Sequence, residues 1–317
     1  MLRCDLLTGT VAIEVDQTGK PVPTVVRQLP EGPAACPLCG IARRDLAGEN
    51  PSAAGDVLRA ELGPPGRAYA VDNRWKLLDA PPDGRGALPA ARGEEADGAG
   101  TVELVLTPEH ATSLDGLDPA DATALVTLLL RRQADLSEQY GSALAFLSVG
   151  VQAGSSLPHL HGQVAGFSWQ PPTGEPDQPD CPVCRDLRRA READRIVDER
   201  DGWTLYVPWG PATSGELRVA LHPAPGEPGC QARPWEPSPE EMGPLFAAAL
   251  VDALVRLESL GYHWPYQIVW HPEPHPHAHL LPRLDLGLIY PRFIGVMPVT
   301  FDHTSYARRL AAARSVR

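Results

Sequence analysis

Hydrophobic and polar residues alternate along this chain with two different periods. Short runs rich in Val and Leu, at 102–106, 143–149, 216–221 and 266–270, are typical of buried strands. Two longer segments repeat apolar residues at helical spacing. Because short strands and long helices are mixed, the pattern predicts an α+β fold in which antiparallel sheets pack against long helices.

Both predicted helices begin with a capping signal. Asp118 precedes Pro119 at the start of the first helix, and proline is favoured at the first helical position. Ser238 and Glu241 form a capping-box pattern at the start of the second helix, which we expect to end near Leu260. The apolar face of the first helix contains Leu125, Leu128, Leu129 and Leu136.

The same order of elements occurs twice in the 317 residues: a Cys-x-x-Cys pair, a strand, a long helix, a strand and a His-x-His pair. The pairs are Cys36 with Cys39, His159 with His161, Cys181 with Cys184, and His277 with His279. We interpret this order as the duplication of an α+β unit of about 130 residues, although two ordinary α+β stretches could resemble each other by chance. The expected domains are 1–169 and 181–317, joined by a proline-rich linker at 170–180.

Composition and charge exclude several classes of protein. The formal charge of −12 argues against general binding to nucleic acids or anionic membranes, which need a basic surface. No apolar run approaches the ~18 residues of a membrane span, and the N-terminal residues lack the apolar core of a signal peptide. We therefore expect a cytoplasmic protein without nucleic-acid or membrane partners. The segment 84–100, rich in Gly, Ala and charge, predicts a mobile loop.

Four residues of the first half could close a tetrahedral zinc site, since zinc prefers thiolate and imidazole ligands. They are Cys36, Cys39, His110 and His159. Such a site would hold the strand that carries His159 and so would fix His161, two residues along on the same face. A redox pair or an idle surface pair is the alternative for the two cysteines.

His161 is the candidate nucleophile of the chain. A neutral, oriented imidazole can attack a phosphorus atom. Gln163, two residues beyond, would lie on the same side of a strand and could donate to a phosphoryl oxygen as charge develops there. Small residues upstream, including Gly154, would let backbone amides approach a phosphate. A buried structural histidine is the alternative.

The segment 153–166, AGSSLPHLHGQVAG, resembles the active-site signature of galactose-1-phosphate uridylyltransferases, a branch of the histidine triad superfamily. In this branch a glutamine, here Gln163, replaces the third histidine of the triad. Other segments similar to the family are RCDLLTGTVAIEV at 3–15, the knuckle at 36–39, DNRW at 72–75 and TPEH at 107–110. The resemblance covers nearly the whole chain and weakens after the linker, so the chain is identified as a divergent member. It implies that 1–169 and 181–317 are two tandem histidine-triad-like units, each an antiparallel sheet with a long helix, and that the first is the catalytic one.

The resemblance implies a ping-pong reaction through a covalent nucleotidyl-histidine. His161 would attack the α-phosphorus of a nucleoside diphosphate sugar and expel a sugar 1-phosphate, and a second sugar 1-phosphate would take the nucleoside monophosphate, expected to be UMP. Gln163 would stabilise the phosphoryl oxygens. The resemblance also implies a homodimer, and substrate contacts by Lys20, Asn73, Arg74 and Ser156 in addition to Gly154.

Three segments depart from the family pattern. Only Lys20 is basic at 16–21, where the family has two phosphate-binding arginines. The segment 292–298 lacks the glutamate that contacts the sugar in the family, and Ser148 stands where the family usually has asparagine. These departures leave two alternatives open. One is a phosphorylase acting on nucleoside diphosphate sugars or dinucleoside polyphosphates, and the other is an inactive, zinc-held nucleotide-binding protein.

The second half carries candidate ligands for a second zinc. They are Cys181, Cys184 and His277, with His222 as the fourth ligand and His271 or Cys230 as its alternatives. The run His275-x-His277-x-His279 places alternating imidazoles on one face, which suits a metal or, alternatively, a pH-sensitive surface patch. The resemblance implies a second zinc in the adenylyl-sugar phosphorylase branch and iron, with a glutamate and several histidines, in other relatives. We expect no second catalytic centre, because no glutamine follows the second His-x-His pair.

Overall fold

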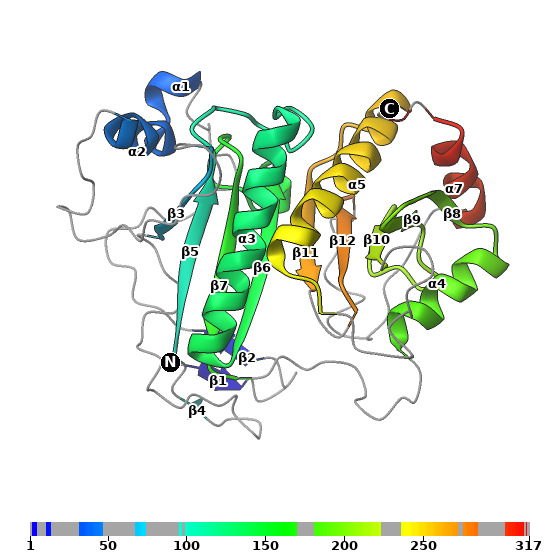
Figure 1. Cartoon of the computed structure of the whole chain (residues 1–317), viewed down its shortest axis with the longest axis horizontal. Coiled ribbons are helices and arrows are strands. Elements are labelled where there is room, and N and C mark those ends of the chain that lie inside the picture. Colours follow the sequence, from blue (N-terminus) through cyan, green and yellow to red (C-terminus); the bar gives the residue numbers. More distant parts are fainter. Residues whose placement is uncertain are drawn as a thin grey trace.

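One antiparallel sheet of nine strands runs through both halves of the described chain (Figure 1). The computed structural model describes residues 2–4, 11–13, 32–46, 67–73, 95–96, 99–169, 181–222, 236–271, 275–284, 302–313 and 315. In spatial order the strands are β3 (Tyr69–Asp72), β5 (Gly100–Leu106), β7 (His161–Phe167), β6 (Ser142–Val149), β11 (Tyr266–His271), β12 (His277–Pro282), β10 (Leu217–Leu221), β9 (Trp203–Tyr206) and β8 (Ile196–Arg200).

The two halves meet where β6 pairs with β11, with Leu147 opposite Ile268. Counted outward from this pair, the sheet continues as β7, β5 and β3 in the first half and as β12, β10, β9 and β8 in the second. The inner three strands of each half therefore have the same spatial and chain order, which supports a duplication. The expected α+β fold is confirmed, and the two expected sheets are joined into one. The linker at 170–180 lies outside the described residues, so the domain boundaries stay a prediction.

Two long helices, α3 (Pro119–Tyr140) and α5 (Pro239–Ser259), lie side by side on one face of the sheet (Figure 1). The shorter helices are α1 (Gly32–Ala35), α2 (Pro37–Leu46), the 3-10 helix η2 (Val151–Ala153), α4 (Pro182–Glu192) and α7 (His303–Ala311). A separate small sheet has the order β2 (Val11–Ile13), β1 (Leu2–Cys4) and β4 (Glu95–Ala96). Among the helices that the structure describes, none is both long and apolar enough to cross a membrane.

The predicted helix starts are confirmed. The Asp118 side chain accepts a hydrogen bond from the backbone N–H of Ala120 at the start of α3. Ser238 and Glu241 form the expected capping box at the start of α5, each side chain accepting a hydrogen bond from the other residue's backbone N–H. The expectation of a loop throughout 84–100 is wrong at two places, because β4 pairs with β1 and Gly100 begins β5. Both segments gain backbone hydrogen bonds from partners that are distant in sequence.

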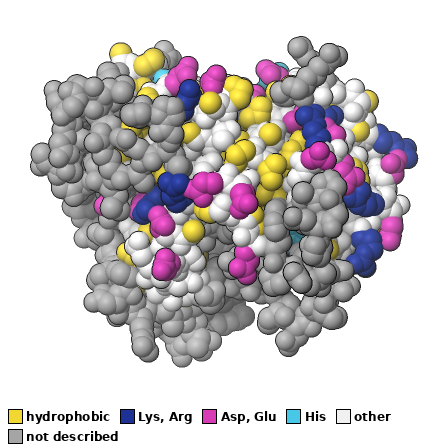
Figure 2. Space-filling model, in the orientation of Figure 1, with side chains coloured by type: hydrophobic (Ala, Val, Ile, Leu, Met, Phe, Trp, Pro, Cys, Tyr) yellow, Lys and Arg dark blue, Asp and Glu magenta, His cyan; other side chains and the backbone are white. Residues whose placement is uncertain are grey.

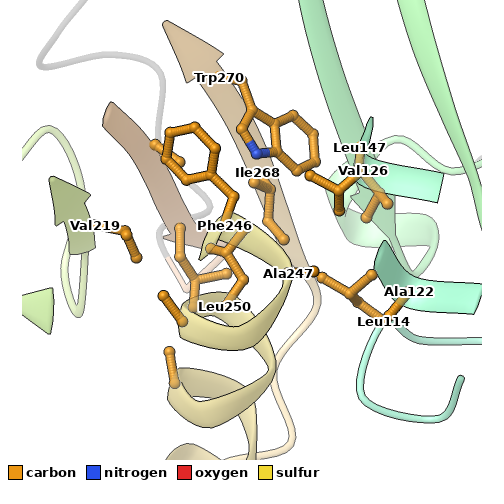
Figure 3. Close-up of a cluster of buried hydrophobic side chains, with 14 of the residues drawn as sticks. Leu114, Ala122, Val126, Leu147, Val219, Phe246, Ala247, Leu250, Ile268 and Trp270 are labelled. Atoms are coloured by element: carbon orange, nitrogen blue, oxygen red, sulfur yellow. The ribbon is translucent and has the colours of Figure 1, made fainter. Parts of the chain in front are cut away.

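A large apolar core lies between the long helices and the sheet and extends through both halves, and two smaller apolar clusters lie near the two Cys-x-x-Cys pairs. Figure 3 shows Phe246 of α5 near Ile268 and Trp270 of β11. Side chains of the first half, Ala122 and Leu147 among them, lie next to Ala247 and Trp270. The apolar face predicted for α3 is buried: Leu125, Leu128, Leu129 and Leu136 are at most 1% exposed. Since burial of apolar area is the main favourable term in folding, this shared core joins the halves.

Basic side chains lie beside acidic ones over the described part of the face in Figure 2, most clearly over the second half. Ion pairs on the surface include Arg191 with Glu199 and Arg308 with Asp194. Exposed pairs of this kind contribute about 0–1 kcal/mol each. Both pairs also lie within the second half, so they do not connect the two halves.

Candidate active site and metal clusters

The first Cys/His cluster brings together four residues from three distant parts of the chain. Cys36 precedes α2, Cys39 lies in its first turn, His110 follows β5 and His159 precedes β7. Their ligand atoms all lie within 4.8 Å of one another. The Nδ1 atom of His159 is 3.7 Å from Cys36 Sγ and 3.3 Å from Cys39 Sγ, and Cys39 Sγ is 3.1 Å from His110 Nδ1. A sulfur and a nitrogen on one tetrahedral zinc lie about 3.5 Å apart, so these residues fit the ion.

The His159 ring is oriented for metal ligation by a backbone contact. Its Nε2 lies 2.9 Å from the carbonyl oxygen of Thr107, which can only accept, so Nε2 carries the proton and Nδ1 presents its lone pair to the cysteines. Burial lowers the pKa of His159 to about 4, so the imidazole is neutral at pH 7. A neutral ring is the form that binds a metal.

A backbone carbonyl also orients His161, but it contacts the other ring nitrogen. Its Nδ1 lies 2.8 Å from the carbonyl oxygen of His159, so Nδ1–H donates and the lone pair is on Nε2. The residue is 5% exposed at the first position of β7. Burial lowers the pKa of His161, although the hydrogen bond to the His159 carbonyl opposes this effect. The neutral ring with a free Nε2 lone pair is the nucleophilic tautomer.

Gln163 lies on the same face of β7 as His161, the face away from α3. The intervening Gly162 faces the helix, because a Cβ atom there would lie 2.5 Å from Leu129 Cδ2. Gln163 stands opposite Phe146 of β6 and is half-buried. The predicted pair of His161 and Gln163 is therefore placed on one side of the sheet, as strand periodicity requires.

A tight turn connects β6 to the segment that carries His159 and His161. The predicted phosphate contact Gly154 has φ +91° and its amide donates to the Val151 carbonyl, so it shapes the turn instead of offering its amide to a phosphate. Ser156 is exposed, whereas Ser155 is buried and its Oγ donates to the Leu157 carbonyl. Sequence reasoning missed this structural role of Ser155. The signal was a serine shortly before a proline, because serine hydroxyls often bond to the backbone of a turn.

The remaining predicted substrate contacts lie apart from this turn or outside the described residues. Asn73 follows β3, is half-buried, and its backbone N–H donates to the Val102 carbonyl. Lys20, Arg74 and the segment 292–298 are not among the described residues.

The second Cys/His cluster corrects the predicted ligand set. The structure groups Cys181 and Cys184 with His275, whose Nδ1 lies 3.6 Å and 3.3 Å from the two sulfurs, and not with His277. The Nε2 atom of His275 lies 2.7 Å from the Leu221 carbonyl oxygen, which matches the contact of His159 with Thr107. His275 is therefore the counterpart of His159, and its distances also fit a zinc ion.

The fourth ligand predicted for this cluster, His222, follows β10. Burial lowers the pKa of His275, the hydrogen bond to the Leu221 carbonyl opposes this effect, and the charge of His222 makes a smaller lowering contribution. His222 is nevertheless not among the described ligand atoms that lie within 4.8 Å of one another. The alternative ligand Cys230 lies outside the described residues.

A third cluster contains His271, His277 and His279. Strand register produces it, because His271 of β11 stands opposite His277 of β12. The His271 and His277 rings stack with their centres 4.9 Å apart, and burial lowers the pKa of His271 to about 4. Three imidazoles grouped in this way could hold a transition metal. The sequence offered His271 as an alternative ligand beside Cys181 and Cys184, whereas the structure groups it with His277 and His279.

Glu216 is a buried carboxylate at this third cluster that sequence reasoning missed. It is 0% exposed, its Oε1 accepts a hydrogen bond from His279 Nδ1 at 2.7 Å, and it also accepts from Arg218 Nε at 2.7 Å. These contacts lower the pKa of Glu216 against the opposing effect of burial, which is the largest influence on it. A carboxylate behind a metal-binding histidine orients the ring. Its position at the start of a predicted strand carried no signal for this contact.

The counterparts of His161 and Gln163 in the second half are His277 and His279. The Nδ1 atom of His277 lies 2.7 Å from the His275 carbonyl oxygen, as His161 Nδ1 does from that of His159. Alignment of His-x-His-x-Gln with His-x-His-x-His would have given this equivalence from the sequence. The predicted pairing of His159 and His161 with His277 and His279 was out of register by two residues.

Comparisons with known proteins find similarity in sequence and in fold. No family model matches the chain. Over 152 residues it is 30% identical to the galactose-1-phosphate uridylyltransferase of Thermotoga maritima, a match that covers 44% of this chain and 47% of that enzyme. The chain thus spans about half the length of the curated relative that it matches.

Two solved structures share the fold along nearly the whole chain. A uridylyltransferase has a TM-score of 0.68 at 20% identity and covers 98% of this chain and 97% of its own. An ADP-glucose phosphorylase from Arabidopsis thaliana, solved with bound ADP-glucose, has a TM-score of 0.67 at 16% identity and covers 99% of each chain. At these identities the likeness establishes the fold alone.

Proposed function

We propose that this chain, a divergent relative of galactose-1-phosphate uridylyltransferases, transfers a nucleoside monophosphate between a nucleoside diphosphate sugar and a sugar 1-phosphate. The group expected first is UMP, carried covalently on His161. The observation that carries the proposal is the hydrogen bond from His161 Nδ1–H to the His159 carbonyl, because it leaves the Nε2 lone pair as the nucleophile.

In the proposed first step, His161 Nε2 forms a bond to the α-phosphorus of the donor. The bond from that phosphorus to the bridging oxygen breaks, and its electron pair leaves on the oxygen of the sugar 1-phosphate. Gln163, on the same face of β7, donates its side-chain amide to a non-bridging oxygen. In the second step a phosphate oxygen of the acceptor attacks the same phosphorus and releases His161.

Zinc would have a structural part in this mechanism. Cys36, Cys39, His110 and His159 would hold it, and the ion would cross-link α2 to the ends of β5 and β7. The peptide carbonyl of His159 orients His161, so anchoring the His159 side chain also anchors the nucleophile. We propose that Ser156 contacts the phosphates and that Asn73, Arg74 and Lys20 are further substrate contacts.

Intact-protein mass spectrometry tests the covalent step. We expect brief mixing with a panel of nucleoside diphosphate sugars, followed by a neutral quench, to add the mass of one nucleoside monophosphate to the protein. His161→Ala, checked for zinc content and fold, should show no adduct. No adduct on zinc-loaded wild-type protein with any donor in the panel would contradict the proposal.

A phosphorylase is the second candidate function, and the Cys181, Cys184 and His275 cluster favours it. A second zinc in this half is what the resemblance implies for the adenylyl-sugar phosphorylase branch. In this reaction inorganic phosphate attacks the nucleotidyl group on His161 and gives a nucleoside diphosphate. Adding phosphate or sugar 1-phosphates separately to the isolated adduct distinguishes the two functions, because only the true acceptor discharges it rapidly.

A further inference from the structure

The start of β11, in the second half, contacts the first half next to the turn that precedes the candidate nucleophile. Gly150 has φ +87°, and a Cβ atom there would lie 3.0 Å from Pro265 Cβ, so Pro265 packs against the Gly150 backbone. The neighbouring Tyr266 is 6% exposed, and its hydroxyl oxygen accepts a hydrogen bond from the Leu114 backbone N–H. These contacts bring residues of the two halves together at the end of β6.

Gln267 adds a polar contact at the same place. It stands opposite Ser148 in the β6–β11 register. Its side-chain Nε2 donates to the Ala153 carbonyl at 3.0 Å and to Ser148 Oγ at 3.3 Å. One carboxamide thus connects a strand of the second half both to the last residue of η2 and to β6.

The Ala153 carbonyl belongs to the turn that carries Ser156 toward the His159–His161 segment. Within this turn the Ser155 amide donates to the Gly150 carbonyl at 3.2 Å, and farther along the Leu160 amide donates to the Ala111 carbonyl at 2.7 Å. The contact from Gln267 reaches Ala153, within the segment that the hydrogen bond between Ser155 and Gly150 closes, and it comes from a strand of the second half. It restrains the direction in which Gly154, Ser155 and Ser156 leave η2.

We infer that Gln267 is a positioning residue for nucleotidyl transfer at His161, acting through the Ala153 carbonyl on the turn at 151–156. The inference rests on the proposed function and extends it, since it gives the second half a part in the first half's active site. A neutral amide donor suits this place. A carboxylate would set an acceptor against the carbonyl acceptor of Ala153, and an apolar side chain would leave that carbonyl without this donor.

Two variants, Gln267→Glu and Gln267→Met, remove the donor while keeping a similar side-chain length. We expect each to raise KM for the nucleotide donor about tenfold, as the loss of one well-placed hydrogen bond can, with kcat changed less than about twofold. Deuterium exchange at the amides of 151–156 should become faster in both variants. Zinc content and the melting temperature should stay close to those of the wild type. Two variants of different polarity are used so that the test still works if one of them misfolds.

Arg131→Ala is the matched control. It removes the ion pair between Arg131 of α3 and Glu240 of α5, which also connects the two halves but lies among the helices. This control should leave KM and the exchange of 151–156 unchanged. If both Gln267 variants kept the KM of the wild type and its exchange at 151–156, the inference would be overturned. Adduct formation by the wild type would still support the proposed function in that case. Absence of any adduct in the wild type would overturn the proposed function and, with it, the inference.

Discussion

A backbone carbonyl sets the chemistry of each paired histidine in this protein. His159 and His275 donate from Nε2 to carbonyls of Thr107 and Leu221 and direct Nδ1 at cysteine sulfur. His161 and His277 donate from Nδ1 to the carbonyls of the histidines two residues earlier, which leaves Nε2 for chemistry or metal. The two histidines of each pair therefore have opposite tautomers, because a different ring nitrogen donates to a carbonyl in each.

Cys39 is the most informative ligand to change in the first cluster, because its sulfur approaches both His110 and His159. We expect Cys39→Ser to remove one equivalent of zinc and to lower the melting temperature by roughly 10 °C, since metal bound only to the folded state adds to its stability. Elemental analysis and thermal unfolding measure both effects.

Cys184→Ser is the control for this prediction. It should remove metal from the second cluster and leave the first one filled, so nucleotidylation of His161 should persist. If Cys39→Ser retained full zinc and full stability, the first cluster would not be a structural metal site.

At the scale of elements, glycine allows the two long helices to approach each other closely. A Cβ atom at Gly243 of α5 would lie 2.0 Å from Thr127 Oγ1 and 2.8 Å from Thr127 Cα of α3. A side-chain oxygen can rotate away, but a backbone atom cannot move without its helix. The helix crossing therefore depends on this glycine despite the low helix propensity of glycine.

We expect Gly243→Ala to lower the free energy of unfolding by about 2 kcal/mol, because overpacking outweighs the gain in helix propensity. Urea unfolding measures the change. Gly40→Ala is the control: Gly40 lies in α2 with no atom within 4 Å of a Cβ there, so this variant should be neutral or slightly more stable. A stabilised Gly243→Ala would show that the helices separate at little cost.

At the scale of the whole molecule, a buried arginine connects the last described helix to the rest of the second half. Arg256 of α5 is 4% exposed and donates to Asp252 and Asp198 at 2.6 Å each. It also donates to the carbonyls of Leu310 and Ala311 at the end of α7. One guanidinium thus joins α5, β8 and the C-terminus of α7, where a cation is favourable.

We expect Arg256→Leu to lower the free energy of unfolding by about 3 kcal/mol, because it leaves buried carboxylates and carbonyls without their donor. Faster deuterium exchange in α7 should accompany the loss. Arg308→Ala, which breaks the exposed pair with Asp194, should change stability by less than about 0.5 kcal/mol. Equal effects of the two variants would contradict a special role for Arg256.

Local signals in the sequence determined the class of fold, the helix starts and the first cluster. Capping residues act on adjacent backbone amides, so Asp118 and Ser238 could be interpreted without knowing their surroundings. The pairs Cys36 with Cys39 and His159 with His161 have spacings that place each pair on one side of its own segment. The predicted first cluster accordingly needed no correction.

Contacts between residues distant in sequence depend on how the whole chain packs. Three alternating histidines at 275–279 allow two registers, and the pairing of β12 with β10 decides which ring meets Cys181 and Cys184. Strand pairing likewise decides three further features. They are the joining of both sheets through β6 and β11, the buried pair of Glu216 with His279, and the contact of Gln267 with Ala153. A period-two pattern shows which residues share a face but not which strand lies beside them, and that choice is made by the packing of the whole chain.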